Sequence, residues 1–123
     1  YAKAYVNRAA VYMKSECSDK ALSDYSRAIE IDPKYSEAYF NRGVINANLG
    51  KRDKAIDDYS HAIELAPDNK LGYYNRGLTY GKMGKLELAI ADFNNALKID
   101  PNFTSAYKNR EIAFQRLKMQ NPR

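Results

Sequence analysis

The fold of this chain is decided by residues 36–69, which read SEAYFNRGVINANLGKRDKAIDDYSHAIELAPDN. Small and apolar residues recur at steps of three and four over 36–49 and again over 52–65, as one face of an α-helix requires. Gly50 separates the two runs at a typical helix C-cap position, and Pro67 prevents the second helix from continuing. The segment therefore predicts two amphipathic helices joined by a tight turn.

The same pattern recurs on both sides of this segment at an interval of 34 residues. Several sets of positions keep one register, which is the signature of a repeat architecture. They are the prolines Pro33, Pro67 and Pro101; the tyrosines Tyr5, Tyr39, Tyr73 and Tyr107; the asparagines Asn7, Asn41, Asn75 and Asn109, each followed by an arginine; and the aspartates Asp24, Asp58 and Asp92. This register predicts helices at about 2–15, 18–31, 36–49, 52–65, 70–83, 86–99 and 104–119.

Each column has a physical role in the expected packing. Gly43 is expected to face Ala55, as the small residues at the same places in the other units do, so that the two helices of a unit approach closely. The aromatic residue at Tyr59 and its equivalents should fill the gap between successive units, because a helix pair cannot bury its apolar face alone. An arginine at the place of Arg42 and an aspartate at the place of Asp58 occur together in every unit. This predicts an arginine–carboxylate pair between the two helices of each unit.

The order of these residues resembles the signature of the tetratricopeptide repeat family. The three units read Tyr5-Ala9-Tyr12-Ala21-Tyr25-Ala28-Pro33, then Tyr39-Gly43-Asn46-Ala55-Tyr59-Ala62-Pro67, then Tyr73-Gly77-Tyr80-Ala89-Phe93-Ala96-Pro101. Asn46 departs from an aromatic column. Glu16 stands where Gly50 and Gly84 stand in the other units, so a residue with a side chain is expected in a left-handed conformation there.

The resemblance implies an all-α fold, a right-handed superhelical α-solenoid of antiparallel helix pairs with seven helices. It implies a single domain over residues 1–123, with repeats at about 2–35, 36–69 and 70–103 and a capping helix at about 104–119. Glu111 replaces the small residue of the other units, which favours a final helix with a face toward water.

The N-terminal end lacks a comparable polar cap. Tyr1 falls in the column of Tyr35 and Phe103, which precede helices of the later units. We therefore expect that the chain was cut from a longer array. An uncapped first helix would also allow end-to-end self-association through its exposed apolar edge.

Relatives of this family bind extended peptides or partner helices in a concave groove formed by the first helix of each repeat. Carried over by position, the groove is basic with an aromatic floor. The candidate residues are the asparagines Asn7, Asn41, Asn75 and Asn109, the aromatic residues Phe40 and Tyr74, and the cations Lys3, Lys14, Lys82, Lys108 and Arg116. Leu78 and Ile112 would add apolar surface. An asparagine carries both an acceptor and two donors, so the asparagine column resembles a ladder that holds a peptide backbone. Local hydrogen bonding within the helices is the alternative role.

A more specific subfamily, which binds chaperone tails through a carboxylate clamp, is disfavoured. The clamp needs lysine and asparagine in the first unit, asparagine in the second, and lysine and arginine in the third. Those positions hold Val6, Ala10, Asn41, Leu71 and Asn75, so Asn41 is the one match. Without the cations, strong recognition of a terminal carboxylate in that manner is not expected.

Composition supplies few candidates for catalysis. His61 is the only histidine, Cys17 is the only cysteine, and neither belongs to a catalytic or metal-binding motif. We expect no enzymatic activity, no cofactor and no membrane-spanning segment, because no apolar run approaches the necessary length. One cysteine fits a reducing compartment, and a cytoplasmic location is expected.

Three classes of function remain open for a chain of net charge +5. The first is a scaffold that binds a protein or peptide, with acidic partners among the candidates. The second is the substrate-recruiting segment of a larger enzyme or of a secretion or assembly complex. The third, nucleic-acid binding, is disfavoured because the related RNA-reading arrays use a 35-residue unit, whereas this chain repeats every 34 residues.

Overall fold

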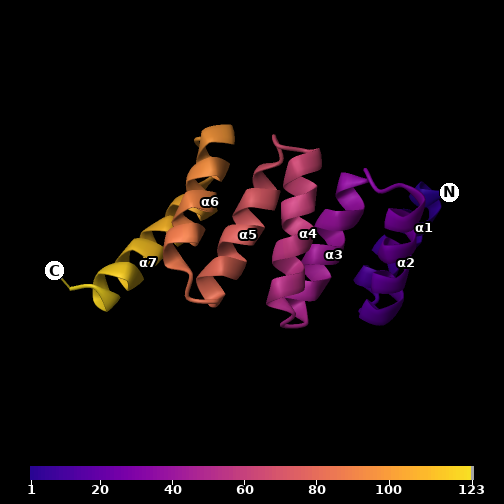
Figure 1. Ribbon diagram of the computed structural model, residues 1–123, viewed down its shortest axis with the longest axis horizontal. Coiled ribbons are helices and arrows are strands. Elements are labelled where there is room, and N and C mark those ends of the chain that lie inside the picture. Colours follow the sequence, from indigo (N-terminus) through magenta and orange to yellow (C-terminus); the bar gives the residue numbers. More distant parts are fainter. Residues whose placement is uncertain (123) are drawn as a thin grey trace. The chain divides into compact units, whose positions relative to one another are not determined.

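The computed structural model describes residues 1–122, and this part of the chain contains seven α-helices and no strand (Figure 1). The helices are α1 (Ala2–Lys14), α2 (Ser18–Ile31), α3 (Ser36–Asn48), α4 (Arg52–Leu65), α5 (Lys70–Lys82), α6 (Leu86–Ile99) and α7 (Thr104–Gln120). Every expected helix is confirmed to within about one residue at each end. The chain divides into two compact units, Tyr1–Ala66 and Pro67–Arg123.

Two kinds of residue end the helices. The second helix of each repeat stops before a proline, and the preceding residue is extended in two of them, with φ of −134° at Asp32 and −133° at Asp100. The turn inside each repeat needs one residue with positive φ, which is Glu16 (62°), Gly50 (77°) or Gly84 (76°). The expected left-handed conformation of Glu16 is thus confirmed, and the first repeat carries a strain that glycine avoids in the other two.

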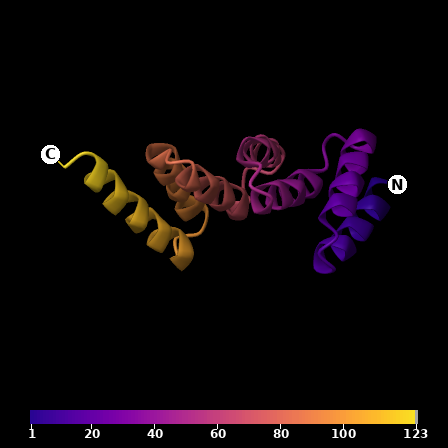
Figure 2. The same cartoon turned by 90° about the horizontal axis from the view of Figure 1, so that it is seen from below.

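In the first unit, α1 packs on α2, α2 on α3, and α3 on α4. Figures 1 and 2 show α1 and α2 side by side, joined by the short turn after Lys14. Tyr25 of α2 has no exposed surface and lies in one cluster with Val6 of α1 and with Ala38 and Ile45 of α3. The aromatic residue of the second helix therefore fills the gap to the next repeat, as predicted.

In the second unit, α5 packs on α6 and α6 on α7, and α5 also contacts α7. Phe93 of α6 is buried in one cluster with Ala113 of α7 and with the partly buried Tyr74 and Leu78 of α5. The final helix buries only Ala106 and Ala113 among its residues, and Glu111 is exposed. One face of α7 thus packs and the rest meets water, as the substitution at Glu111 led us to expect.

The small residues of the first helices lie against the aromatic residues of the second helices. A Cβ atom added to Gly43 would lie 2.8 Å from Cε1 of Tyr59 and 3.3 Å from Cβ of Asp58. The absence of a side chain at Gly43 thus lets the Tyr59 ring lie close to the backbone of α3. The expected contact of Gly43 with Ala55 stays a prediction.

Gly77 and Gly81 of α5 offer a matched test of this contact. A Cβ on Gly77 would come within 2.8 Å of the buried Phe93 ring, whereas a Cβ on Gly81 would meet nothing within 4 Å. Both Gly→Ala changes gain the same helix propensity, about 1 kcal/mol. We expect Gly77→Ala to be less stable than Gly81→Ala by about 1–3 kcal/mol, the usual cost of overpacking, in urea denaturation. Equal free energies of unfolding would show that the ring yields without cost.

Candidate functional site

An arginine–aspartate pair joins the two helices of every repeat, as predicted. Nε and Nη2 of Arg8 donate hydrogen bonds to the two carboxylate oxygens of Asp24 over 2.8 and 2.7 Å. The same two-pronged contact joins Arg42 to Asp58 at 3.0 and 2.7 Å. It recurs in the third repeat between Arg76 and Asp92, at 2.8 Å for both bonds. These arginines therefore hold the two helices of each repeat together through the edge of the guanidinium group.

The pair shifts the titration of both partners in the first repeat. The hydrogen bonds from Arg8 lower the pKa of Asp24 below its ordinary value, although burial of this carboxylate acts in the opposite direction. The same contact raises the pKa of Arg8. Asp24 is therefore ionised at neutral pH and stabilises the folded state in that form.

A lowered pKa in the folded state makes stability depend on pH in a defined direction. The stabilisation by Asp24 is complete above its unfolded pKa of about 3.9 and is lost as the pH falls below that value toward the folded pKa. Asp24→Asn should therefore be less stable than the wild type at about pH 7, and the difference should shrink at about pH 2.5. Urea denaturation of both proteins, with Asp68→Asn at an exposed position as control, measures this. A difference that does not change with pH contradicts the assignment.

Within the first unit, the predicted groove residues lie on α1 and α3. Lys3, Asn7 and Lys14 of α1 are exposed, and Phe40 and Asn41 of α3 are half-buried. The Phe40 ring packs on the Tyr59 ring with centroids 5.8 Å apart. Burial raises the pKa of Tyr25, the charge of Glu37 adds to the rise, and the Asn41 amide beside the hydroxyl opposes it.

Within the second unit, three predicted groove residues meet at one place. Lys82 at the end of α5 and Asn109 and Arg116 of α7 line a pocket with a volume of about 170 Å³. Leu78 and Ile112 form its apolar wall, together with Gly81, Phe93 and Ala113. Tyr74, Asn75 and Lys108 lie on the same two helices but do not line the pocket.

Three hydrogen bonds fix the polar groups of this pocket. Nδ2 of Asn109 donates to the Tyr74 hydroxyl at 2.9 Å and to the Ser105 carbonyl at 2.9 Å. Both amide hydrogens are thus in use, and Asn109 offers a ligand its carbonyl oxygen. Nη1 of Arg116 donates to the Gly81 carbonyl at 3.0 Å, which holds the guanidinium at the rim.

Sequence reasoning missed the part that Gly81 has in this pocket. Gly81 follows Gly77 by four residues, and its carbonyl accepts the hydrogen bond from Arg116. A second glycine on the same helix, outside the repeat columns, was the available signal. Phe93 was assigned to the core, where it is buried, yet it also closes the base of the pocket.

The N-terminal end of α1 was the predicted surface for self-association. Tyr1 is 98% exposed, whereas Tyr35 and Phe103 at the equivalent positions are partly buried and pack against core clusters. A pocket of about 320 Å³ lies beside it, lined by Tyr1, Ala4, Tyr5 and Arg8. Self-association through this end stays a prediction.

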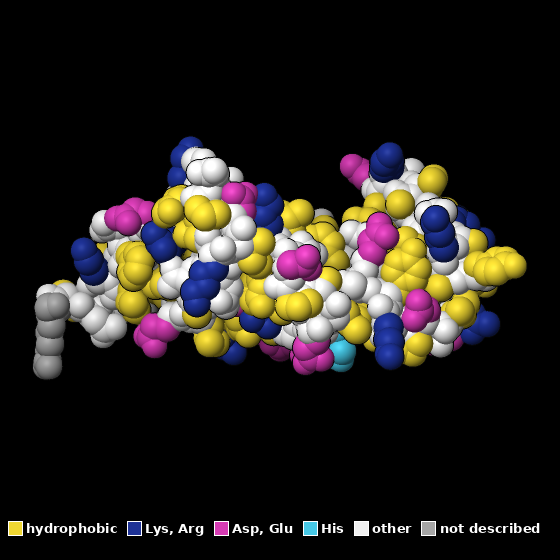
Figure 3. Space-filling model, turned by 90° about the horizontal axis from the view of Figure 1, so that it is seen from above, with side chains coloured by type: hydrophobic (Ala, Val, Ile, Leu, Met, Phe, Trp, Pro, Cys, Tyr) yellow, Lys and Arg dark blue, Asp and Glu magenta, His cyan; other side chains and the backbone are white. Residues whose placement is uncertain are grey.

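No three His, Cys, Asp or Glu side chains of residues 1–122 come together in a way that could hold a metal ion. None of the helices described has both the length and the apolar character to span a bilayer. On the face drawn in Figure 3, hydrophobic side chains stand among charged ones of both signs.

The tetratricopeptide repeat family model matches the sequence three times, over residues 2–35, 36–69 and 71–103. The chain therefore belongs to the tetratricopeptide repeat family, and its fold is the all-α solenoid of that family. A comparison with curated proteins finds no significant match.

Solved structures of the same fold resemble the chain closely. The first tetratricopeptide domain of Spaghetti (RPAP3), bound to the HSP90 peptide SRMEEVD, is 26% identical with a TM-score of 0.91, covering 94% of this chain and 92% of that one. A crystal structure of MamA is 25% identical, with a TM-score of 0.93, and the match covers 98% of this chain and 71% of that one. The first such domain of human RPAP3 is 25% identical, with a TM-score of 0.90 over 98% and 95%. These likenesses support a protein-interaction scaffold.

Proposed function

We propose that this chain binds an extended segment of a partner protein along the first helices of its repeats, without catalysing a reaction. The observation that carries the proposal is the pocket between α5 and α7. Lys82, Asn109 and Arg116 surround an apolar wall of Leu78 and Ile112 there. An apolar wall with a few fixed polar groups is the usual composition of a ligand site.

The charges around this pocket favour an acidic partner. Helix α5 carries no acidic residue; its Lys70 is paired with Asp100 at 2.6 Å, whereas Lys82 lines the pocket. Helix α7 carries Glu111 as its only acid. Gln115 donates to the Glu111 carboxylate at 3.2 Å. A peptide with an apolar side chain would place it against Leu78, and flanking carboxylates would meet the cations.

Asn109 adds recognition of the peptide backbone. Because Tyr74 and Ser105 take its amide hydrogens, its carbonyl oxygen is left to accept a hydrogen bond from a peptide N–H group. Of the two roles expected for an asparagine in the ladder, accepting and donating hydrogen bonds, Asn109 would therefore perform the accepting one. Asn41 and Asn75 are half-buried at the equivalent positions of α3 and α5.

The RPAP3 relative was solved with an HSP90 peptide that ends in EEVD, which supports a peptide as the partner. A terminal carboxylate held as in the chaperone clamp is not part of the proposal, because Val6, Ala10 and Leu71 occupy clamp positions. The same surface would serve if the chain recruits substrates for a larger enzyme or an assembly complex.

The test uses a fluorescent peptide with blocked ends in which Glu and Asp alternate with Leu, followed by anisotropy. Lys82→Ala/Arg116→Ala should weaken binding by about tenfold or more, since each charged contact is worth about 1.5–3 kcal/mol. Lys34→Ala/Lys98→Ala removes the same charge at exposed positions outside the pocket and should bind like the wild type.

Two outcomes would count against the proposal. Equal loss in both double variants would mean that net charge alone attracts the peptide. Equal affinity for a peptide with Lys in place of Glu and Asp would show that the cations of the pocket do not select an acidic partner. Asn41→Ala/Asn75→Ala tests the ladder separately, and unchanged affinity with unchanged helix content by circular dichroism would exclude these two asparagines.

A further inference from the structure

The second repeat lacks an aromatic ring that the first and third repeats place beside their paired arginine. Cζ of Arg8 lies 5.9 Å from the centroid of the Tyr12 ring, and Cζ of Arg76 lies 5.9 Å from that of Tyr80. Asn46 occupies the same place in the second repeat. Two of the three repeats thus have an aromatic residue at this position, and the second repeat does not.

The other ring beside each arginine is present in all three repeats. Cζ of Arg42 lies 5.7 Å from the Tyr39 ring, and its equivalents lie 5.6 Å from Tyr5 and 5.9 Å from Tyr73. In the first and third repeats the guanidinium thus contacts two rings. Among the described residues, Arg42 contacts one.

The space left by the missing ring is open. A pocket with a volume of about 370 Å³ lies beside Asn46, inside the first unit, with walls from α2, α3 and α4. Asn46 is 5% exposed, and its Nδ2 donates to Asp58 at 3.0 Å. This bond turns the short side chain toward its own repeat, so Asn46 does not fill the volume that tyrosine occupies elsewhere. Leu22 and Arg42 contribute an apolar and a cationic wall.

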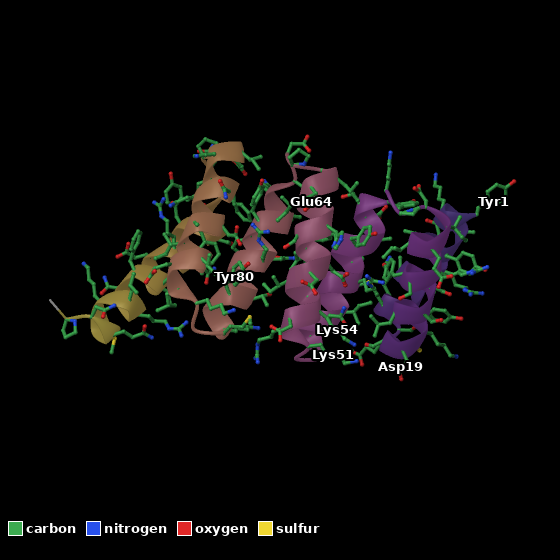
Figure 4. All side chains as sticks on the ribbon, viewed as in Figure 1. Tyr1, Asp19, Lys51, Lys54, Glu64 and Tyr80 are labelled. Atoms are coloured by element: carbon green, nitrogen blue, oxygen red, sulfur yellow. The ribbon has the colours of Figure 1, made fainter. Side chains whose placement is uncertain are left out.

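Two lysines stand at the rim of this Asn46 pocket. Lys51 and Lys54 line it near the N-terminal end of α4, where Figure 4 shows them. Lys54 is the equivalent of Lys20 in the first repeat, whose Nζ lies 5.6 Å from the centroid of the Tyr12 ring. A ring bound in the pocket would therefore meet a lysine as well as an arginine.

The acids of the pocket do not cancel this charge. Asp58 is paired with Arg42 at 2.7 Å, which leaves one further acid in the lining, Asp57, against the two lysines Lys51 and Lys54. Neither lysine forms an ion pair within the described part of the chain. The rim therefore attracts a carboxylate that accompanies a ring.

We propose that the Asn46 pocket receives an aromatic side chain of a partner protein, flanked in that partner by acidic residues. The partner ring takes the place that Tyr12 and Tyr80 take in the other repeats, beside Arg42 and Lys54, and a neighbouring carboxylate meets Lys51. None of the groove candidates lines this pocket, so the site is separate from the surface proposed above.

The experiment follows the isotope-labelled chain by two-dimensional NMR during titration with blocked peptides Gly-Asp-Xaa-Glu-Gly. With Tyr as Xaa, amide shifts should concentrate in α2, α3 and the start of α4, and binding should be at least about tenfold tighter than with Ala as Xaa. Equal binding of the two peptides would overturn the proposal, because no ring would then be recognised.

Asn46→Tyr is the decisive variant, since it supplies the ring from the chain itself. It should weaken binding of the tyrosine peptide by at least about tenfold and raise the melting temperature. Asn102→Tyr adds a tyrosine at an exposed turn of the second unit and should leave the affinity unchanged. Unchanged affinity of Asn46→Tyr would overturn the proposal.

A second variant keeps the test valid if Asn46→Tyr does not fold. Lys51→Ala/Lys54→Ala alters exposed side chains and should weaken the same peptide by about fivefold or more. Unaltered affinity would overturn the proposal, as would equal binding of a peptide with Lys in place of both acids. Dimerisation of the wild type that Asn46→Tyr abolishes would assign the pocket to a second copy and overturn it too. Lys82→Ala/Arg116→Ala should bind the tyrosine peptide normally, which separates this test from that of the groove.

Discussion

Each repeat depends on one contact between its two helices, the arginine that donates two hydrogen bonds to an aspartate 16 residues later. The three aspartates are buried, and a buried carboxylate without a partner would be costly. The pair can form in one register of the helices only, because a guanidinium and a carboxylate match edge to edge. That register brings Gly43 against the ring of Tyr59 and Gly77 against that of Phe93. The exposure of the arginines nevertheless differs, with 59% for Arg8 against 20% for Arg76.

Because the pair sets the register in every repeat, residues at other positions can differ between repeats without changing the fold. The effect of such a difference is seen by comparing equivalent positions. Tyr12 and Tyr80 cover their arginines, whereas Asn46 turns to Asp58 and leaves a pocket beside Arg42. Some contacts between repeats also recur. Nη1 of Arg110 donates to Asn94, 16 residues before it, at 2.8 Å, as Nη1 of Arg42 donates to Ser26 at 3.3 Å.

In the proposed mode of binding, Asn109 combines a structural and a binding role in one side chain. Asn109 holds the Tyr74 hydroxyl and the Ser105 carbonyl with its amide hydrogens and keeps its acceptor for other contacts. Tyr74 in turn packs on Phe103 with ring centroids 4.7 Å apart. The groups that would meet a peptide are thus positioned by contacts within the core, which lowers the entropy that binding must offset.

The sequence by itself determined the fold of this protein. The period of 34, the prolines after the second helices and the helical spacing of apolar residues predict all seven helices, since these signals act locally along the chain. The arginine–aspartate pairs followed from their repetition. Which side chains share a pocket was decided only by tertiary structure, because the stagger between two helices is a property of their packing. The close approach of the Tyr59 ring to Gly43 was therefore not foreseen, and Lys82 came together with Arg116 through the contact of α5 with α7. The departure of Asn46 was visible in the sequence, but the cavity beside it exists because three helices surround that point in space.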